Sequence, residues 1–160
     1  IDILINNAGV GYFPASDEAD EKKFQDMLQV NVVGLTMLTK HVVPHMKKQK
    51  SGLIINISST SGKVGVAGSE FYNATKFGVM GFSEGLRLEL QPFGIKVSTV
   101  CPGMVHTNIF SPEEIYHRLK TRLAGKMPTM LDASDVARVI SLICNQPEHS
   151  DIQDVTVKPF

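Results

Sequence analysis

The stretch LIINISSTSGKVGVAGSEFYNATK, residues 53–76, decides the fold of this chain, because three patterns follow one another within it. Residues 53–57 are almost continuously apolar and β-branched, which is typical of a strand covered on both faces of a parallel sheet. Residues 58–69 are rich in Ser, Thr and Gly and predict a loop. A helical pattern follows over Glu70 to Gln91. A strand that leads through a polar loop into a helix indicates an α/β fold.

Similar units occur on both sides of this stretch. Further strands are predicted over Asp2 to Asn6, Ile95 to Val100 and Asp154 to Val157, and further helices over Asp20 to Lys48, Pro112 to Leu123 and Ser134 to Asn145, the last with Ser134 or Asp132 as its N-cap. Long helices between apolar strands are the crossovers that parallel strands require. The order β-α-β-α-β-(α)-α-β predicts one incomplete domain over residues 1–160, built as half or more of a doubly wound, Rossmann-like parallel sheet.

Two of the predicted helices carry informative stripes. The first stripe, at 3–4 spacing, is apolar with one polar member: Phe24, Leu28, Asn31, Leu35, Leu38 and Val42. The second consists of small residues: Ala74, Gly78, Gly81 and Gly85. Each glycine inside a helix costs about 1 kcal/mol relative to Ala. We therefore expect another helix to approach this second stripe closely, either within the chain or across a subunit interface.

Composition excludes several classes of function. The formal net charge is zero, 42% of the residues are hydrophobic and 20% are charged, which does not favour nucleic acid or an anionic membrane as the partner. No apolar run approaches the roughly 20 residues of a spanning helix. Cys101 and Cys144 lie far apart and predict reduced thiols in a cytoplasmic protein. His41 and His45 have ligand spacing but enclose Pro44 and lack a third ligand, so no metal site is predicted.

Polar residues follow each of the three apolar strands. The first strand leads into Asn6-Asn7-Ala8-Gly9, the second into residues 58–62 (SSTSG), and the third into residues 101–107 (CPGMVHT). The carboxyl ends of parallel strands meet at one edge of the sheet, and ligands of open α/β sheets bind there. The three loops together predict a polar ligand site.

Tyr72 and Lys76 open the helix that follows the second of these loops. Residues at i and i+4 share a helix face, so the phenol and the ammonium are expected to point into the same space. A nearby cation favours the phenolate and lowers the pKa of a tyrosine from its usual value near 10, which allows proton transfer near neutral pH. A serine hydroxyl at the end of the preceding strand is expected to lie near Tyr72 and Lys76 and to form the site with them. Ser59 is favoured for it by its spacing to Tyr72, with Ser58 as the alternative.

These residues together resemble the short-chain dehydrogenase/reductase family. Asn31, Ser59, Tyr72 and Lys76 stand in the order and spacing of that family's catalytic tetrad, and the resemblance extends over essentially the whole chain. It implies that Tyr72 is the general acid/base, that Lys76 tunes it and binds the nicotinamide ribose, and that Ser59 binds the substrate carbonyl. Asn31 is implied to hold a water of a proton relay. The alternative for Asn31 is a core residue at a helix kink.

The resemblance also implies the residues that line the cofactor. They are Asn7, Ala8 and Gly9 after the first strand, Tyr72 and Lys76, and Pro102, Gly103, Val105 and Thr107 after the third, with Val105 meeting the carboxamide through its backbone. The family's Gly-rich TGxxxGxG turn, which binds the pyrophosphate, does not occur in these 160 residues. The chain is therefore expected to be a fragment that holds strands 4-5-6-7 of a seven-stranded sheet and binds cofactor poorly by itself.

The implied activity is hydride transfer between a nicotinamide cofactor and a carbonyl or secondary alcohol. NADP is favoured over NAD because the stretch Pro147 to Pro159 resembles the subgroup acting on 3-hydroxy acids such as serine. Substrate choice is expected to lie in Asn108 to Pro128. Family habit and the glycine stripe predict a homodimer or homotetramer. The alternative is a non-catalytic, nucleotide-binding or scaffold relative, although such proteins usually lose the Tyr or the Lys.

Overall fold

The computed structural model describes residues 1–110 and 129–160, and within them the chain forms one parallel sheet. The strands, in spatial as well as chain order, are β1 (Ile3–Asn6), β2 (Gly52–Ile57), β3 (Ile95–Pro102) and β4 (Asp154–Val157). All three pairings are parallel. The predicted α/β class and the four predicted strands are confirmed, and β3 extends two residues further than expected.

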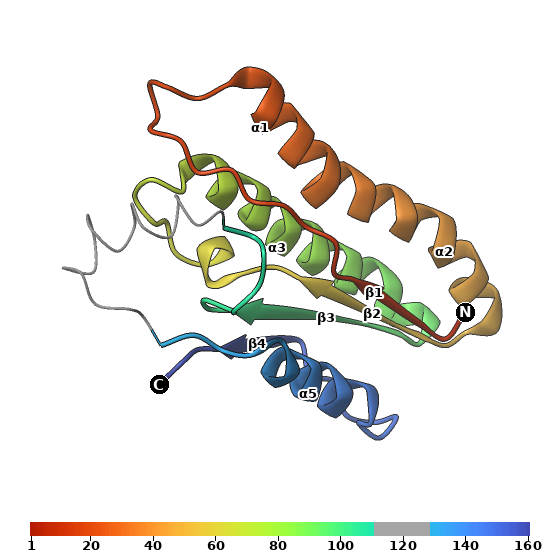
Figure 1. Cartoon of the computed structure of the whole chain (residues 1–160). Coiled ribbons are helices and arrows are strands. Elements are labelled where there is room, and N and C mark those ends of the chain that lie inside the picture. Colours follow the sequence, from red (N-terminus) through yellow and green to blue (C-terminus); the bar gives the residue numbers. More distant parts are fainter. Residues whose placement is uncertain (111–128) are drawn as a thin grey trace.

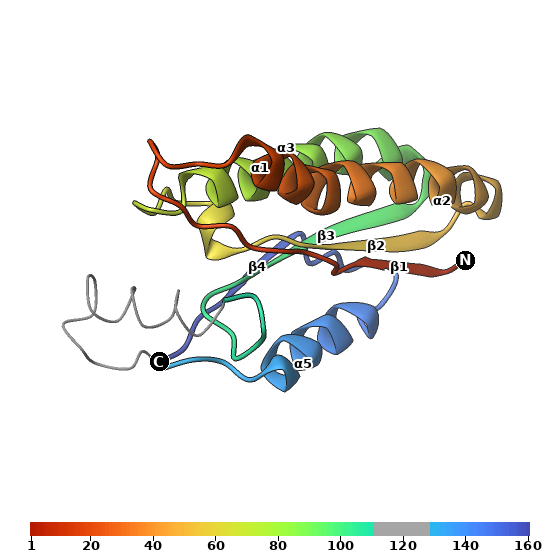
Figure 2. The same cartoon turned by 45° about the horizontal axis from the view of Figure 1, so that its top comes forward.

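Helices cover both faces of the sheet (Figures 1 and 2). On one face lie α1 (Glu21–Leu28), a π-helix (Gln29–Gly34), α2 (Leu35–Gln49) and α3 (Glu70–Leu90), and on the other lies α5 (Ala133–Cys144). Asp132 caps α5 through a capping box with Asp135. The predicted helix over Pro112 to Leu123 lies outside the described residues. Among the described helices, none is long and apolar enough to cross a membrane.

The first long helix differs from the prediction in one respect. Its turns at Gln29–Gly34 form a π-helix, which is wider than an α-helix and changes the angular phase of the residues that follow. As a result Leu38, which the 3–4 spacing placed in the core, is 49% exposed. Thr39 and Met46 are buried on the inner face instead, at 1% and 0% exposure. Asn31 lies within the π-helical segment and is buried, as expected.

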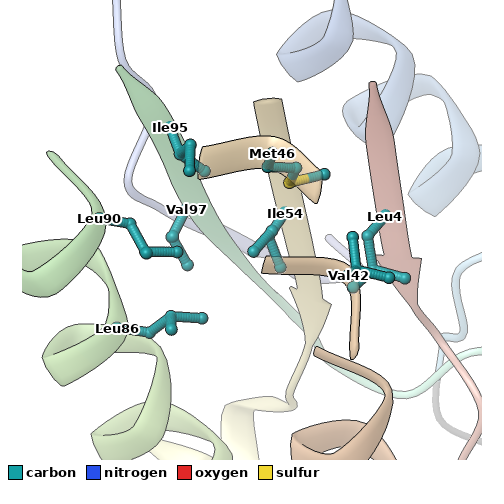
Figure 3. Close-up of a cluster of buried hydrophobic side chains, with 8 residues drawn as sticks. All are labelled: Leu4, Val42, Met46, Ile54, Leu86, Leu90, Ile95 and Val97. Atoms are coloured by element: carbon teal, nitrogen blue, oxygen red, sulfur yellow. The ribbon is translucent and has the colours of Figure 1, made fainter. Parts of the chain in front are cut away.

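The apolar core lies between the sheet and the helices α2 and α3. Its buried members are Leu4, Val42, Met46, Ile54, Leu86, Leu90, Ile95 and Val97 (Figure 3). A second cluster on the opposite face joins Ile55, Ile57 and Val100 to Val136 and Ile143. Successive residues of a strand point to opposite faces. The uninterrupted apolar sequence of β2 follows from this, because both of its faces are covered.

Buried polar side chains cross the sheet near the carboxyl ends of β1 and β2. Asn6 Nδ2 donates to Thr39 Oγ1 at 3.0 Å and to Asn56 Oδ1 at 2.8 Å, and Asn56 Nδ2 donates to Ser83 Oγ at 2.8 Å. Asn6 and Asn56 are register partners in the two strands. These bonds tie α2, β1, β2 and α3 together, so the loops that follow the strands start from fixed positions.

Candidate active site

A cavity of about 1210 Å3 lies at the carboxyl ends of the strands. This exceeds the roughly 300–1000 Å3 that is usual for small-molecule sites. Ten residues singled out from the sequence line it: Asn7, Ala8, Gly9, Ser59, Tyr72, Lys76, Pro102, Gly103, Val105 and Thr107. Asn31 is the one predicted site residue that does not line it. The fold therefore gathers around one space residues that are up to 100 positions apart in the chain.

Lys76 reaches the cavity from α3 although its side chain is almost fully buried. The residue is 4% exposed, and Nζ donates to the carbonyl oxygen of Ile57 at 3.0 Å. Within residues 1–110 and 129–160 this is the only hydrogen bond of the ammonium, and no carboxylate there forms an ion pair with it. Burial lowers the pKa of Lys76 from 10.5 to about 8, while the electrostatic interaction with Cys101 acts to raise this pKa. Two of the three N–H donors remain for a ligand.

Tyr72 lies one helical turn before Lys76 on the same face of α3. The residue is 8% exposed, and Lys76 Nζ lies 5.6 Å from the centroid of its ring. The shared face that the i, i+4 spacing predicts is thus present in the structure. At this distance from the ring centroid the ammonium makes a cation–π contact with Tyr72.

The two serines after β2 have different partners. Ser58 is 3% exposed, and its hydroxyl donates to the backbone carbonyl of Lys76 at 3.0 Å. Ser59 is half-buried, and its oxygen accepts from the backbone N–H of Ser61 at 3.1 Å. That bond leaves the hydroxyl proton of Ser59 without an acceptor among the described residues. Ser58 thus holds the loop on α3, whereas the hydroxyl proton of Ser59 is available to a ligand, and the role of Ser59 in binding a substrate stays a prediction.

Asn31 holds the loop after β1 against α3. Its Oδ1 accepts from the backbone N–H of Val10 at 2.8 Å, and its Nδ2 donates to the carbonyl of Val10 at 2.9 Å and to Thr75 Oγ1 at 3.2 Å. A Cβ added to Gly9 would lie 3.4 Å from Asn31 Oδ1 and 3.5 Å from Lys76 Nζ. Gly9 therefore lies between the two side chains, and the amide of Asn31 positions the wall of the cavity. A role for Asn31 in a proton relay stays a prediction.

The loop after β3 is fixed at two places. The N–H of Gly103 donates to the carbonyl of Val157 at 2.7 Å, and Val105 pairs with Leu131 in a short parallel bridge. Before this loop, Cys101 is fully buried with a pKa raised by that burial, which makes it an unreactive thiol. His106, in the same loop, is exposed and does not line the cavity.

Two residues of the cavity lining are not indicated by any pattern in the sequence. Phe13 and Phe110 line the cavity next to Tyr72, but they belong to loops and follow no periodic pattern. Gly62 lies in the predicted loop over residues 58–69 and does not line the cavity. Gly62 is buried in a 3-10 helix (Thr60–Gly62), where an added Cβ would lie 2.4 Å from Ser58 Oγ and 2.7 Å from the carbonyl oxygen of Lys76.

Comparisons with known proteins agree with this geometry. Residues 1–115 match the family model described as short chain dehydrogenase. An uncharacterised oxidoreductase of Staphylococcus saprophyticus is 35% identical over 159 residues, which are 99% of this chain and 64% of that protein. A 3-ketodihydrosphingosine reductase of Bacteroides thetaiotaomicron is 45% identical over 107 residues, which are 67% of this chain and 40% of that protein. The solved structure of a serine dehydrogenase complexed with NADP+ is 31% identical with a TM-score of 0.86, and the match covers 98% of this chain and 64% of that one.

The chain belongs to the short-chain dehydrogenase family. It spans 64% of the length of the staphylococcal relative and of the serine dehydrogenase. Among the described residues, no group of three His, Cys, Asp or Glu side chains is placed to hold a metal ion.

Proposed function

We propose that the full-length gene product is an NADP-dependent oxidoreductase that interconverts a carbonyl and a secondary alcohol at this cavity. One observation carries the proposal: the nearly buried ammonium of Lys76 lies beside Tyr72, without a carboxylate partner among the described residues, at the edge of a large cavity. A structural lysine would be expected to keep its head group in water or to pair it with an anion. This one is held where it can act on a ligand and on the phenol.

The residues present fit a dinucleotide cofactor. Lys76 keeps two donors for the hydroxyls of a ribose, and Gly9 leaves the space in front of it open. Asn7, Ala8, Pro102, Gly103, Val105 and Thr107 would line the same ligand. NADP is favoured because the similar serine dehydrogenase is complexed with NADP+. When bound, the cofactor supplies the hydride, so that ketone, NADPH and a proton give secondary alcohol and NADP+.

The chain's own residues handle the proton in this proposal. Ser59 donates its hydroxyl proton in a hydrogen bond to the carbonyl oxygen and so holds the substrate in place. Tyr72 transfers its phenolic proton to that oxygen as negative charge develops there, and it takes the proton back in the oxidative direction. Lys76 stabilises the phenolate that remains, because opposite charges attract strongly where water is excluded.

The substrate class is a finer part of the proposal. The stretch Pro147 to Pro159 and the similar serine dehydrogenase support a 3-hydroxy acid. The 3-ketodihydrosphingosine reductase among the relatives is named for a different compound. A 3-hydroxy acid brings a carboxylate into the site, and a carboxylate in a dehydrated site needs a cation or several hydrogen-bond donors. The side chains around Tyr72 are therefore the feature that distinguishes these substrate classes.

Substitution of Tyr72 by Phe tests the proposed activity. In the full-length gene product, Tyr72→Phe is expected to lower kcat for ketone reduction by at least about 100-fold, the usual contribution of a general acid. NADPH binding, followed by nucleotide fluorescence, should change little. Tyr12→Phe is the matched control, because the Tyr12 hydroxyl accepts from the backbone N–H of Asp20 outside the cavity. Near-normal turnover in Tyr72→Phe would remove Tyr72 from its role as the general acid. NADPH binding without turnover of any carbonyl by the wild type would favour the non-catalytic alternative.

We also propose that α3 packs against a second copy of the chain in a homodimer or homotetramer. Ala74, Gly78, Gly81 and Gly85 lie on its exposed face, together with Phe77 and Leu88 at 45% and 70% exposure. A Cβ added at Gly81 or Gly85 would meet no described atom within 4 Å. The π-helix approaches Gly78, where an added Cβ would lie 3.8 Å from Val32 Cγ2. No described helix approaches Gly81 or Gly85 in this way, so for these two glycines an interface between subunits is the alternative that remains from the sequence analysis.

A further inference from the structure

Three aromatic rings pack in a row in the lining of the cavity, and they come from three different parts of the chain. Phe13 follows β1, Tyr72 opens α3 and Phe110 follows β3. The ring of Phe13 lies 5.1 Å from that of Tyr72 and 4.7 Å from that of Phe110, measured between centroids, with interplanar angles of 52° and 30°. All three residues line the cavity. Tilted pairs at these distances are favourable aromatic contacts. The ring of the phenol expected to protonate a substrate therefore contacts the Phe13 ring, which in turn contacts Phe110.

Gly11 makes this arrangement of rings sterically feasible. A Cβ added at Gly11 would lie 2.5 Å from Cε2 and 2.7 Å from Cζ of Phe13, and 3.1 Å from the carbonyl oxygen of Ile109. Any side chain at position 11 would therefore displace the Phe13 ring or press on the backbone of the loop after β3. The absence of a side chain lets both loops approach Tyr72, with the Phe13 ring between Tyr72 and Phe110.

Further apolar side chains line the cavity together with neutral polar ones. Val66, Met104 and Ile109 are apolar and line the cavity. The described lining contains no Asp, Glu, Arg or His, and its one cation is Lys76. The ammonium of Lys76 is bonded to Ile57 and is the group that the proposed function assigns to the ribose. Apart from Lys76, the described lining offers a substrate carboxylate only neutral hydroxyl, amide and backbone donors in exchange for its hydration.

We infer that the ketone reduced here carries an apolar aryl or alkyl substituent that packs on Phe13 and Phe110, and that Phe13 determines this specificity. The inference rests on the proposed function and deepens it. It favours an uncharged ketone over the 3-oxo and 3-hydroxy acids that the C-terminal stretch suggested. The ring of Phe13 contacts the substituent next to the carbonyl, whereas Ser59 and Tyr72 hold the carbonyl oxygen.

The test compares two ketones in the full-length gene product with NADPH. The wild type is expected to have a kcat/KM for acetophenone at least about tenfold above that for acetoacetate. Phe13→Ala should lower kcat/KM for acetophenone by about tenfold or more, since removal of a packing group from an apolar pocket has effects of this size. It should change kcat/KM for acetoacetate by less than about threefold. Phe13→Leu should keep most of the acetophenone activity, and it serves as the second variant if Phe13→Ala does not fold.

Phe93→Ala is the control, because Phe93 is 40% exposed and precedes β3 at the opposite end of the sheet. It should leave both ketones unaffected. Preference of the wild type for acetoacetate would overturn the inference while leaving the proposed function intact. An equal loss for both ketones in Phe13→Ala would also overturn it, because Phe13 would then only position Tyr72. If the wild type binds no NADPH, or binds it but reduces neither ketone nor oxidises any alcohol, the proposed function itself fails.

Discussion

Lys76 should make the free enzyme less stable than it would be with an uncharged side chain at this position. The pKa of the ammonium falls from 10.5 in an exposed chain to about 8 in the fold. A difference of about 2.5 in pKa corresponds to about 3 kcal/mol, which is the cost of keeping the charge in this site below pH 8. Lys76→Met removes that cost. It also removes the hydrogen bond to the Ile57 carbonyl, and this loss is expected to destabilise the variant by about 1 kcal/mol or more.

The pH dependence separates these two effects. Because the folded-state pKa is lowered, the unfolded chain holds the proton more tightly than the folded one between pH 8 and pH 10.5. The stability of the wild type relative to Lys76→Met should therefore rise by about 2–3 kcal/mol from pH 7 to pH 10. The loss of the hydrogen bond contributes equally at both pH values. Urea denaturation of the full-length, cofactor-free protein gives the difference at each pH.

Two controls isolate the charge of Lys76. The comparison is made in a Tyr72→Phe background, because the titration of a phenol so close to the ammonium would be coupled to it. Lys40→Met removes an exposed lysine of α2 and should show no such pH dependence. If the stability difference between the Lys76→Met variant and its parent is the same at pH 7 and pH 10, the reasoning is refuted. Such a result would mean that the ammonium is hydrated or paired in solution.

The remaining predictions concern glycines. Gly62→Ala should destabilise the protein by about 1–3 kcal/mol, because its Cβ would lie 2.7 Å from the backbone oxygen of Lys76. Gly65→Ala, whose Cβ would come no closer than 3.9 Å to another residue, is the control in the same thermal denaturation, and equal melting temperatures would contradict the assigned packing. Gly81→Leu should dissociate the oligomer in sedimentation experiments, since a bulky side chain would block close packing on α3. An unchanged mass together with an unchanged melting temperature would show that this face is not an interface.

The strands and most helix bounds were predictable because the signals are local. Continuous apolar, β-branched runs define β1 to β3, and the face shared by Tyr72 and Lys76 follows from helical spacing within five residues. The π-helix at Gln29–Gly34 has no such signal, since its residues are compatible with an α-helix. It was therefore missed, and the phase of the buried face after it was misassigned at Leu38.

The site was predictable as far as polar residues at strand ends define it. Contacts between loops were not predictable, because Phe13 and Phe110 are 97 positions apart and neither loop has a periodic pattern. The hydrogen bond between the buried side chains of Asn6 and Asn56 was only partly predictable. Each Asn interrupts an apolar strand near its end, and aligning the two strands would have indicated their side-chain hydrogen bond.

The burial of Lys76 and the absence of carboxylates from the described lining have a common physical basis. A carboxylate in the lining would pair with the ammonium and stabilise the fold, but it would occupy the donors of Lys76 and weaken its effect on the Tyr72 phenol. A substrate carboxylate would do the same, and it would compete with the cofactor ribose for that single cation. The described lining contains no anion, and it therefore keeps Lys76 available at a cost in stability. The proposed uncharged ketone would preserve this arrangement during turnover, which agrees with the ring of Phe13 that lies between those of Tyr72 and Phe110.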